Sequence, residues 1–244
     1  MKNYPPGMIG VACGELGRFS VFTPSIIGMQ KPAGTVFFSV TGLGPATPFN
    51  EIAREFLRRS ELKWLFLTND DNLCPPDTIP RLLDRLDTPG VDVVTGLYFG
   101  RIQPFEPVIF DKVKLEDRND GAGMRLWYER RYIKNRENGL ISIVGCGDGC
   151  LMISRRVMEA IPDPWWEYGQ TLTDACDHDI VFSTKVRQAG FGLFCDLDIR
   201  VDHVAVMTVR PVCINGEWQT HLMQADRFIA LPVAHRAEDG NDKS

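Results

Sequence analysis

The chain has 244 residues, of which 44% are hydrophobic and 24% charged, and its formal net charge is −5 at pH 7. This length suits one large domain or two small ones and is enough to bury a substantial core. The acidic balance gives no general attraction to nucleic acid, although a local basic patch stays open. No apolar run approaches the length of a transmembrane helix.

The seven cysteines are scattered along the chain at positions 13, 74, 146, 150, 176, 195 and 213. Cys146 and Cys150 have no second pair at zinc-site spacing, so we expect all seven to be reduced thiols. Residues 1–7 lack the apolar core of a signal peptide. These features together predict a cytoplasmic protein without a membrane span.

The first hundred residues alternate short apolar runs with amphipathic stretches. The apolar runs, which predict buried strands, are residues 8–13, 35–40, 63–68 and 91–99. Three helices are expected between them, one ending at Gln30, one capped by Asn50 and one capped by Asp77 or Thr78. The β-α-β-α-β-α-β order predicts a mostly parallel sheet with helices on both faces.

The second half of the chain has a different pattern. Residues 101–123 contain prolines and glycines and predict an exposed loop. Further strands are expected at residues 124–133, 140–144, 151–154 and 191–195, and helices at 155–161 and 177–189. Residues 235–244 are polar and charged, so we expect a disordered tail.

The strand at 63–68 ends in Asn69-Asp70-Asp71-Asn72. Ligands of open α/β sheets bind beyond the carboxyl ends of the strands, so acids there stand where a cation or phosphate sits. Oxygen ligands at such a position suit Mg²⁺ or Mn²⁺ holding a diphosphate. The alternative is a turn in which Asp and Asn hydrogen-bond the backbone.

Four blocks occur in order along the chain: residues 9–17, LFLTNDDN at 65–72 with PPDT behind it, VGCGDGCLMISRR at 144–156, and DHDIVF at 177–182 followed by Gly190 and Asp202-His203. Together they resemble a GT-A-type glycosyltransferase of the family 2-like kind, including small versions carried by bacteriophages. If the chain is phage-encoded, its compartment is the host cytoplasm. The resemblance covers roughly residues 8–210.

The resemblance implies an α/β fold of the GT-A, Rossmann-like type. Its mostly parallel central sheet is flanked by helices, and a smaller mixed β region lies in the C-terminal half. We expect one catalytic domain over residues 1–210, with a nucleotide-binding half at about 8–100 and an acceptor half at about 101–210. Residues 211–234 then form an extension, before the tail at 235–244.

The resemblance also implies a donor site for a nucleotide-diphosphate sugar and a divalent cation, Mn²⁺ or Mg²⁺. Asp71 is the leading ligand, with Asp70 or Asn69 beside it. His203 is the imidazole ligand that the resemblance implies, although a lone histidine is usually a surface or core residue. The basic residues that we expect to face the diphosphate, unless they are solvated, are Arg54 and Arg101.

Two positions depart from the family pattern. Asn69 stands where the first acid of the Asp-x-Asp metal motif is expected, and His178 stands where the family has a glutamate. Asp179 is the surviving carboxylate of the second motif. At the start of a predicted helix it suits a catalytic base and an N-terminal capping residue alike, and Asp177 beside it is the better cap.

The acceptor side is expected at two places. Gly147 and Gly149 allow the backbone to approach a ligand, and Asp148 between them suits a hydrogen bond to a sugar hydroxyl, unless the segment is a tight hairpin. The indoles of Trp165 and Trp166 suit stacking on a sugar or a base, unless they pack in the core.

The predicted function is transfer of a sugar to an acceptor hydroxyl on a protein, a glycan or a modified DNA base. A nucleotidyltransferase is a second reading, but residues 14–18 form a short loop with an acid where that class has a longer basic one. A third reading is a carbohydrate- or nucleotide-binding module without turnover, which Asn69 and His178 keep open.

Overall fold

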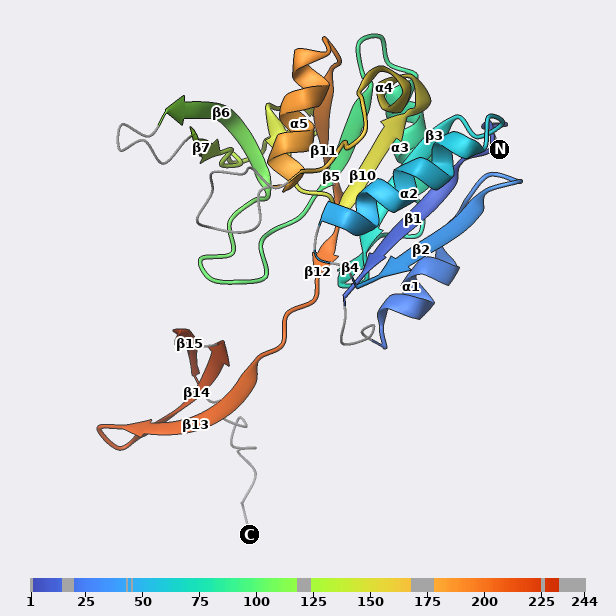
Figure 1. Cartoon of the computed structure of the whole chain (residues 1–244). Helices are drawn as coiled ribbons and strands as arrows, with labels where there is room; N and C mark the ends of the chain where they lie inside the picture. Colours follow the sequence, from blue (N-terminus) through green and yellow to red (C-terminus); the bar gives the residue numbers. More distant parts are fainter. Residues whose placement is uncertain are drawn as a thin grey trace. The chain divides into compact units, whose positions relative to one another are not determined.

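The computed structural model describes residues 2–14, 20–42, 44, 46–117, 124–167, 178–224 and 227–232. The chain divides into two compact units, Met1–Val204 and Ala205–Ser244 (Figure 1). The first unit ends six residues before the boundary expected at 210. The tail expected at 235–244 lies outside the described residues.

A seven-stranded sheet forms the centre of the first unit (Figure 1). Its strands, in spatial order, are β2 (Val36–Thr41), β1 (Met8–Cys13), β3 (Trp64–Asn69), β10 (Cys150–Ser154), β5 (Val93–Leu97), β11 (Leu193–Arg200) and β8 (Leu140–Ser142). β10 runs antiparallel to both of its neighbours, and β8 runs antiparallel to β11. The other five strands are parallel to one another, which confirms the predicted mostly parallel sheet.

Helices cover both faces of this sheet because side chains alternate along each strand. On β3, Leu65 and Leu67 pack toward α2 (Ala46–Arg58), α4 (Arg155–Ala160) and α5 (His178–Gln188). Trp64 and Phe66 point the other way, toward α1 (Phe22–Gly28) and α3 (Thr78–Leu86). The result is two apolar cores in one α/β unit, as the sequence predicted.

Smaller strands complete the first unit. β6 (Ile109–Asp117) pairs with β7 (Met124–Arg130) and with β9 (Gly145–Cys146). β4 (Asn72–Leu73) pairs antiparallel with β12 (Asp202–His203), and in this ladder Asn72 lies opposite His203. The β4–β12 pair is short, but it brings the C-terminal end of the first unit next to Asp70 and Asp71, which follow β3.

Two helix details differ from the sequence-based expectation. α2 begins at Ala46 rather than at Asn50, and Asn50 is a buried residue inside the helix. Pro48 is tolerated there because the first turn of a helix leaves its N–H groups without helical partners. α1 ends at Gly28, two residues before the expected Gln30, and it buries Phe22 and Ile26 while Ile27 is 69% exposed.

The second unit contains a three-stranded antiparallel sheet. Its strands are β13 (Thr208–Ile214), β14 (Glu217–Gln224) and β15 (Arg227–Pro232). Asn215 and Gly216 join the first two strands with φ values of 54° and 85°, which is the Asn-Gly arrangement of a two-residue hairpin turn.

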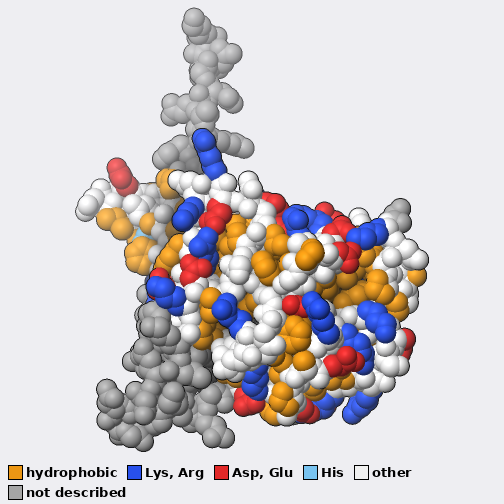
Figure 2. Space-filling view, turned by 90° about the horizontal axis from the view of Figure 1, so that it is seen from above, with side chains coloured by type: hydrophobic (Ala, Val, Ile, Leu, Met, Phe, Trp, Pro, Cys, Tyr) orange, Lys and Arg blue, Asp and Glu red, His pale blue; other side chains and the backbone are white. Residues whose placement is uncertain are grey.

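On the face shown in Figure 2, Lys and Arg side chains are interspersed with Asp and Glu. Within the described ranges, no helix combines the length and the apolar character needed to cross a bilayer.

Candidate functional site

Asp70 and Asp71 form the turn between β3 and β4, at the carboxyl end of the central sheet. Asp70 is directed toward the end of β1, where its carboxylate accepts a hydrogen bond of 3.2 Å from the backbone N–H of Gly14. The backbone N–H of Asp70 itself donates to the carbonyl of Ala12. Asp70 therefore joins the ends of two neighbouring parallel strands.

Asp71 is buried and has two cationic or basic partners on one carboxylate oxygen. Its Oδ2 contacts Nη1 of Arg101 and lies 3.3 Å from Nε2 of His203. Burial alone would raise the pKa of Asp71, but the hydrogen bond and charge of His203, together with Arg101, hold that pKa below its usual value. The ionised form of Asp71 is thus favoured.

His203 reaches Asp71 through the β4–β12 ladder, although 132 positions separate the two residues. The backbone N–H of Val204 donates to the Asp71 carbonyl at 2.8 Å, which fixes the register. Nδ1 of His203 lies 2.9 Å from the carbonyl oxygen of Phe99. Both ring nitrogens therefore face acceptors, Nδ1 the Phe99 carbonyl and Nε2 the Asp71 carboxylate, and a cation bound at Nε2 would take the place of the proton that the Asp71 contact uses.

A carboxylate oxygen and an imidazole nitrogen 3.3 Å apart are a donor set that Mn²⁺ accepts once the cation replaces the proton between them. Among the residues that the structure describes, no group of three or more His, Cys, Asp or Glu side chains could hold a metal ion. Two protein ligands are nevertheless enough for a cation that completes its coordination with substrate phosphates and water. The Phe99 carbonyl supplies the outer hydrogen bond that metal-binding histidines usually have. The residues fit a divalent cation.

A cleft of about 390 Å³ opens at this edge of the sheet. Its lining residues are Ala12, Cys13, Gly14, Gly42, Gly44, Pro48, Phe49, Asn69, Asp70, Asp71, Arg101 and His178. The structure thus brings together four of the five residues that the sequence assigned to the donor.

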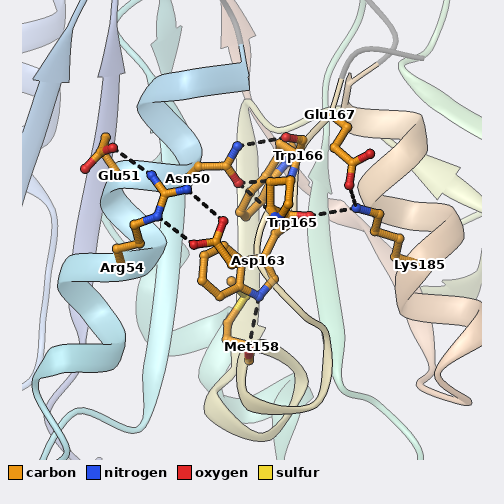
Figure 3. A network of polar contacts seen from close by, with 10 residues as sticks. Asn50, Glu51, Arg54, Met158, Asp163, Trp165, Trp166, Glu167 and Lys185 are labelled. Atoms are coloured by element: carbon orange, nitrogen blue, oxygen red, sulfur yellow. Dashed lines mark hydrogen bonds and ion pairs between the residues drawn. The ribbon is translucent and has the colours of Figure 1, made fainter. Parts of the chain in front are cut away.

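The fifth, Arg54, is not among the residues that line the cleft, and the expectation that it faces a diphosphate is corrected. Its guanidinium donates two hydrogen bonds of 2.7 Å to Asp163 and one of 2.7 Å to Glu51 (Figure 3). Glu51 lies one helical turn earlier on α2, and Asp163 lies in the segment after α4. The sequence around Arg54 indicates a positive charge, but it does not indicate that Glu51 and Asp163 neutralise this charge.

Trp165 and Trp166 are also placed differently from the sequence-based expectation. They are 4% and 1% exposed, so neither indole is open to an acceptor sugar or base. Trp166 stacks on Phe182 and on Phe49, with ring centroids 4.2 and 5.5 Å apart. The pair packs in the core.

Asn50 fixes the backbone of this tryptophan pair (Figure 3). Its carbonyl oxygen accepts the N–H groups of Trp165 and Trp166 at 3.0 and 3.1 Å, and its amide donates to the Trp166 carbonyl at 2.7 Å. A residue expected to cap α2 thus ties the helix to a segment more than a hundred positions away.

The glycine turn before β10 is a packing feature. A side chain at Gly147 would place its Cβ 2.0 Å from the hydroxyl of Tyr98, and one at Gly149 would meet Asn72 Oδ1 at 2.6 Å. The N–H of Gly149 donates to the Tyr98 hydroxyl at 3.1 Å. The glycines are needed because Tyr98 and Asn72 lie directly against the turn.

Asp148, between these glycines, is 4% exposed and does not line the cleft. Its Oδ2 lies 3.4 Å from Nε2 of His178. Burial and the neighbouring charge of Asp179 raise its pKa well above the usual carboxyl value, against the opposing effect of Trp166. A direct hydrogen bond from Asp148 to an acceptor sugar is therefore not available in this arrangement.

Asp179 lies in the first turn of α5, where its Oδ1 accepts the N–H of Ile180 at 2.8 Å. Its charge also contributes to the raised pKa values of Tyr98 and Asp148, so it lies close to the glycine turn. Asp177 lies outside the described residues.

Among the lining residues that were not assigned a role from the sequence, His178 and Phe49 carry the two rings. His178 lines the cleft, and its ring stacks on that of Phe49 with centroids 5.5 Å apart. Burial lowers the pKa of His178 to about 4, so the ring is neutral at neutral pH. The position of Phe49 just behind β2, another parallel strand, is the signal that could have located it.

Comparison with known proteins supplies the family. The profile of glycosyl transferase family 2 matches residues 31–161, which is more than half of the chain. No curated protein matches.

Two solved structures share the fold. A197 from STIV has a TM-score of 0.55 and 14% identity, over 96% of this chain and 99% of its own. GalNAc-T7, solved with UDP, GalNAc and Mn²⁺, has a TM-score of 0.55 and 10% identity. The match covers 84% of this chain and 45% of the GalNAc-T7 chain. At such identities the likeness shows the GT-A fold, and the profile match shows that the chain belongs to glycosyl transferase family 2.

Proposed function

We propose that the protein is a metal-dependent glycosyltransferase that moves a sugar from a nucleotide-diphosphate sugar to an acceptor hydroxyl. The observation that carries this proposal is the 3.3 Å approach of His203 Nε2 to Asp71 Oδ2 beside the cleft at the carboxyl edge of the sheet. Family membership supports glycosyl transfer. The UDP and Mn²⁺ in the GalNAc-T7 structure support the classes of donor and cation.

Asp71 and His203 are the residues that would hold Mn²⁺ or Mg²⁺, with Asp70 beside them. Such a cation supplies Lewis-acid neutralisation of the diphosphate leaving group. The protein's own contribution is to hold the two ligands in place before the donor arrives. Asp71 is fixed by the β3–β4 turn, and His203 is oriented by the Phe99 carbonyl.

The donor occupies the cleft in this proposal. Asp70 and the N–H of Gly14 fix the edge where β1 and β3 end, and Asn69 adds an amide on the same rim. Arg101, which also lines the cleft, supplies positive charge for the diphosphate next to Asp71. His178 and Phe49 form the aromatic part of the lining.

The acceptor hydroxyl loses its proton to Asp179 in this proposal, with Asp177 as the second carboxylate of the segment. The N-terminus of α5 favours a negative charge at Asp179, which keeps the carboxylate ready to accept a proton. The acceptor is a hydroxyl of a protein, a glycan or a modified DNA base.

Incubation with a panel of nucleotide sugars and Mn²⁺ tests the reaction class. Slow release of a nucleoside diphosphate, abolished by EDTA and by Asp71→Asn, is the expected result. Asp87→Asn, which changes an exposed carboxylate that pairs with Lys2 and does not line the cleft, is the matched control. Release of pyrophosphate would instead indicate nucleotidyl transfer, and no release from any sugar nucleotide would indicate a binding module.

A further inference from the structure

Arg101 is carried by the loop between β5 and β6, and this loop is fixed at its base. Phe99 and Pro107 form an isolated bridge, and the N–H of Gly100 donates to the carbonyl of Glu106 at 2.8 Å. The Glu106 carboxylate accepts the Tyr132 hydroxyl at 2.7 Å and pairs with Arg130 at 3.0 Å.

The tip of the same loop is much less enclosed. The side chain of Arg101 is 51% exposed, and neighbouring Ile102 is 61% exposed. From this tip Arg101 reaches the acid cluster and contacts Asp71. The loop therefore combines a fixed base with a cationic side chain that lies on the cleft.

The contact falls on the atom that a metal would need. Arg101 Nη1 and His203 Nε2 both approach Oδ2 of Asp71, so the arginine lies on the same carboxylate oxygen as the histidine that would share the cation. A divalent cation binds a carboxylate oxygen at about 2.0–2.6 Å, where it excludes a guanidinium from the same oxygen. Each cation by itself neutralises the buried carboxylate, so the two are alternatives.

We infer that Arg101 is a built-in counter-ion of Asp71, which a divalent cation displaces, and that the displaced guanidinium then binds the diphosphate of the donor. The second half of this inference rests on the proposed function. Arg101 stays beside the cleft because the base of its loop is held by Glu106. Guanidinium and phosphate form strong charge-assisted hydrogen bonds, which favours this second partner.

The arrangement couples the two ligands. Without nucleotide, the cation must compete with Arg101. With nucleotide, the displaced guanidinium gains a new anionic partner, so each ligand strengthens binding of the other. Removing the guanidinium should therefore change the two affinities in opposite directions, which a purely structural role for Arg101 would not do.

Calorimetric titration with MnCl₂ alone tests the first half, with wild type, Arg101→Gln, Arg101→Lys and Arg58→Gln compared. Arg101→Gln should bind Mn²⁺ about five-fold more tightly, the scale of a half-exposed ion pair. Arg101→Lys keeps the charge and should stay within about two-fold of wild type. Arg58→Gln removes an exposed arginine that pairs with Glu55 on α2, and it should leave Mn²⁺ affinity unchanged.

The second half is tested with UDP, GDP, ADP and CDP at saturating Mn²⁺. The best-bound nucleotide should bind Arg101→Gln about ten-fold more weakly than wild type, the scale of a lost charge-assisted hydrogen bond. Unchanged or weaker Mn²⁺ binding by Arg101→Gln overturns the inference, as does failure of every protein to bind Mn²⁺. If Arg101→Gln binds Mn²⁺ more tightly but no nucleotide binds wild type, the counter-ion role stands and the proposed function fails.

Discussion

Two single residues, His178 on the cleft wall and Asp148 behind it, form a small acid–base pair. Asp148 is buried and the His178 side chain is 12% exposed, their Oδ2 and Nε2 atoms lie 3.4 Å apart, and desolvation favours the neutral form of each. The pair therefore separates the solvent-facing cleft from the tryptophan core without placing a net charge there. The sequence showed Asp148 between two glycines and His178 in place of a glutamate, but it did not predict that these two side chains are in contact.

Replacing Asp148 by Asn should change how stability depends on pH. The raised pKa of Asp148 means that the folded protein keeps a proton that the unfolded chain releases, so wild type loses stability as pH rises toward the folded pKa. Asn has no such proton. From pH 7 upward, the free energy of unfolding of Asp148→Asn should gain on wild type as pH rises until the folded pKa of Asp148 is passed, by at most about 1.4 kcal/mol per pH unit.

Urea denaturation at several pH values measures this, with Asp87→Asn as the exposed control. His178 adds no slope in that window, because its folded pKa of about 4 lies below its usual value and its stabilisation is lost only as pH falls below about 6.5. If Asp148→Asn instead has a free energy of unfolding lower than wild type by the same amount at every pH, and NMR shows a protonated His178, then Asp148 and His178 form an ion pair and the account is contradicted.

The role of Asp179 is tested by Asp179→Asn. The amide oxygen of Asn can still accept the Ile180 N–H, so folding and donor binding should be kept. Transfer should fall by about 10²-fold or more, the scale of a general base. Asp177→Asn should have a much smaller effect, and near-wild-type transfer by Asp179→Asn would remove Asp179 from the mechanism.

At the scale of elements, the alternation of strands and helices in the first hundred residues was predictable because burial imposes periods of 2 and 3.6. The acid cluster was predictable because it ends the most apolar strand. The predictions that Arg54 faces the diphosphate and that the two tryptophans face the acceptor were wrong, because the residues that hold them, Asp163 and Asn50, are distant in sequence. Hydrogen bonds between residues so far apart in the chain cannot be predicted from the spacing of neighbouring residues.

Asn50 offers a direct measure of one such long-range connection. Asn50→Ala leaves two N–H groups and one carbonyl of the Trp165–Trp166 backbone without their partner, and should lower the free energy of unfolding by about 3 kcal/mol. Asn138→Ala, at an exposed loop position, should stay within about 0.5 kcal/mol of wild type. Urea denaturation compares them, and equal stability of the two variants would contradict the assignment.

At the scale of the whole molecule, the described residues of the first unit contain both sheet cores, the described part of the cleft and the β4–β12 ladder. A chain ending at Val204 should therefore unfold cooperatively, with a melting temperature within about 5 °C of the full chain. Removal of 235–244 alone is the control and should have no effect. A truncated protein that binds ANS and melts without cooperativity would show that the second unit is required for folding.

The central claim is that a divalent cation on Asp71 and His203 completes the donor site. Calorimetry of nucleoside diphosphate binding, with Mn²⁺ and with EDTA, tests it most directly in wild type, Asp71→Asn and His203→Gln. We expect wild type to lose about ten-fold or more in affinity when Mn²⁺ is removed, and both variants to bind weakly whether or not Mn²⁺ is present. Equal affinity of wild type in Mn²⁺ and in EDTA, or normal Mn²⁺-dependent binding by Asp71→Asn, would contradict the account.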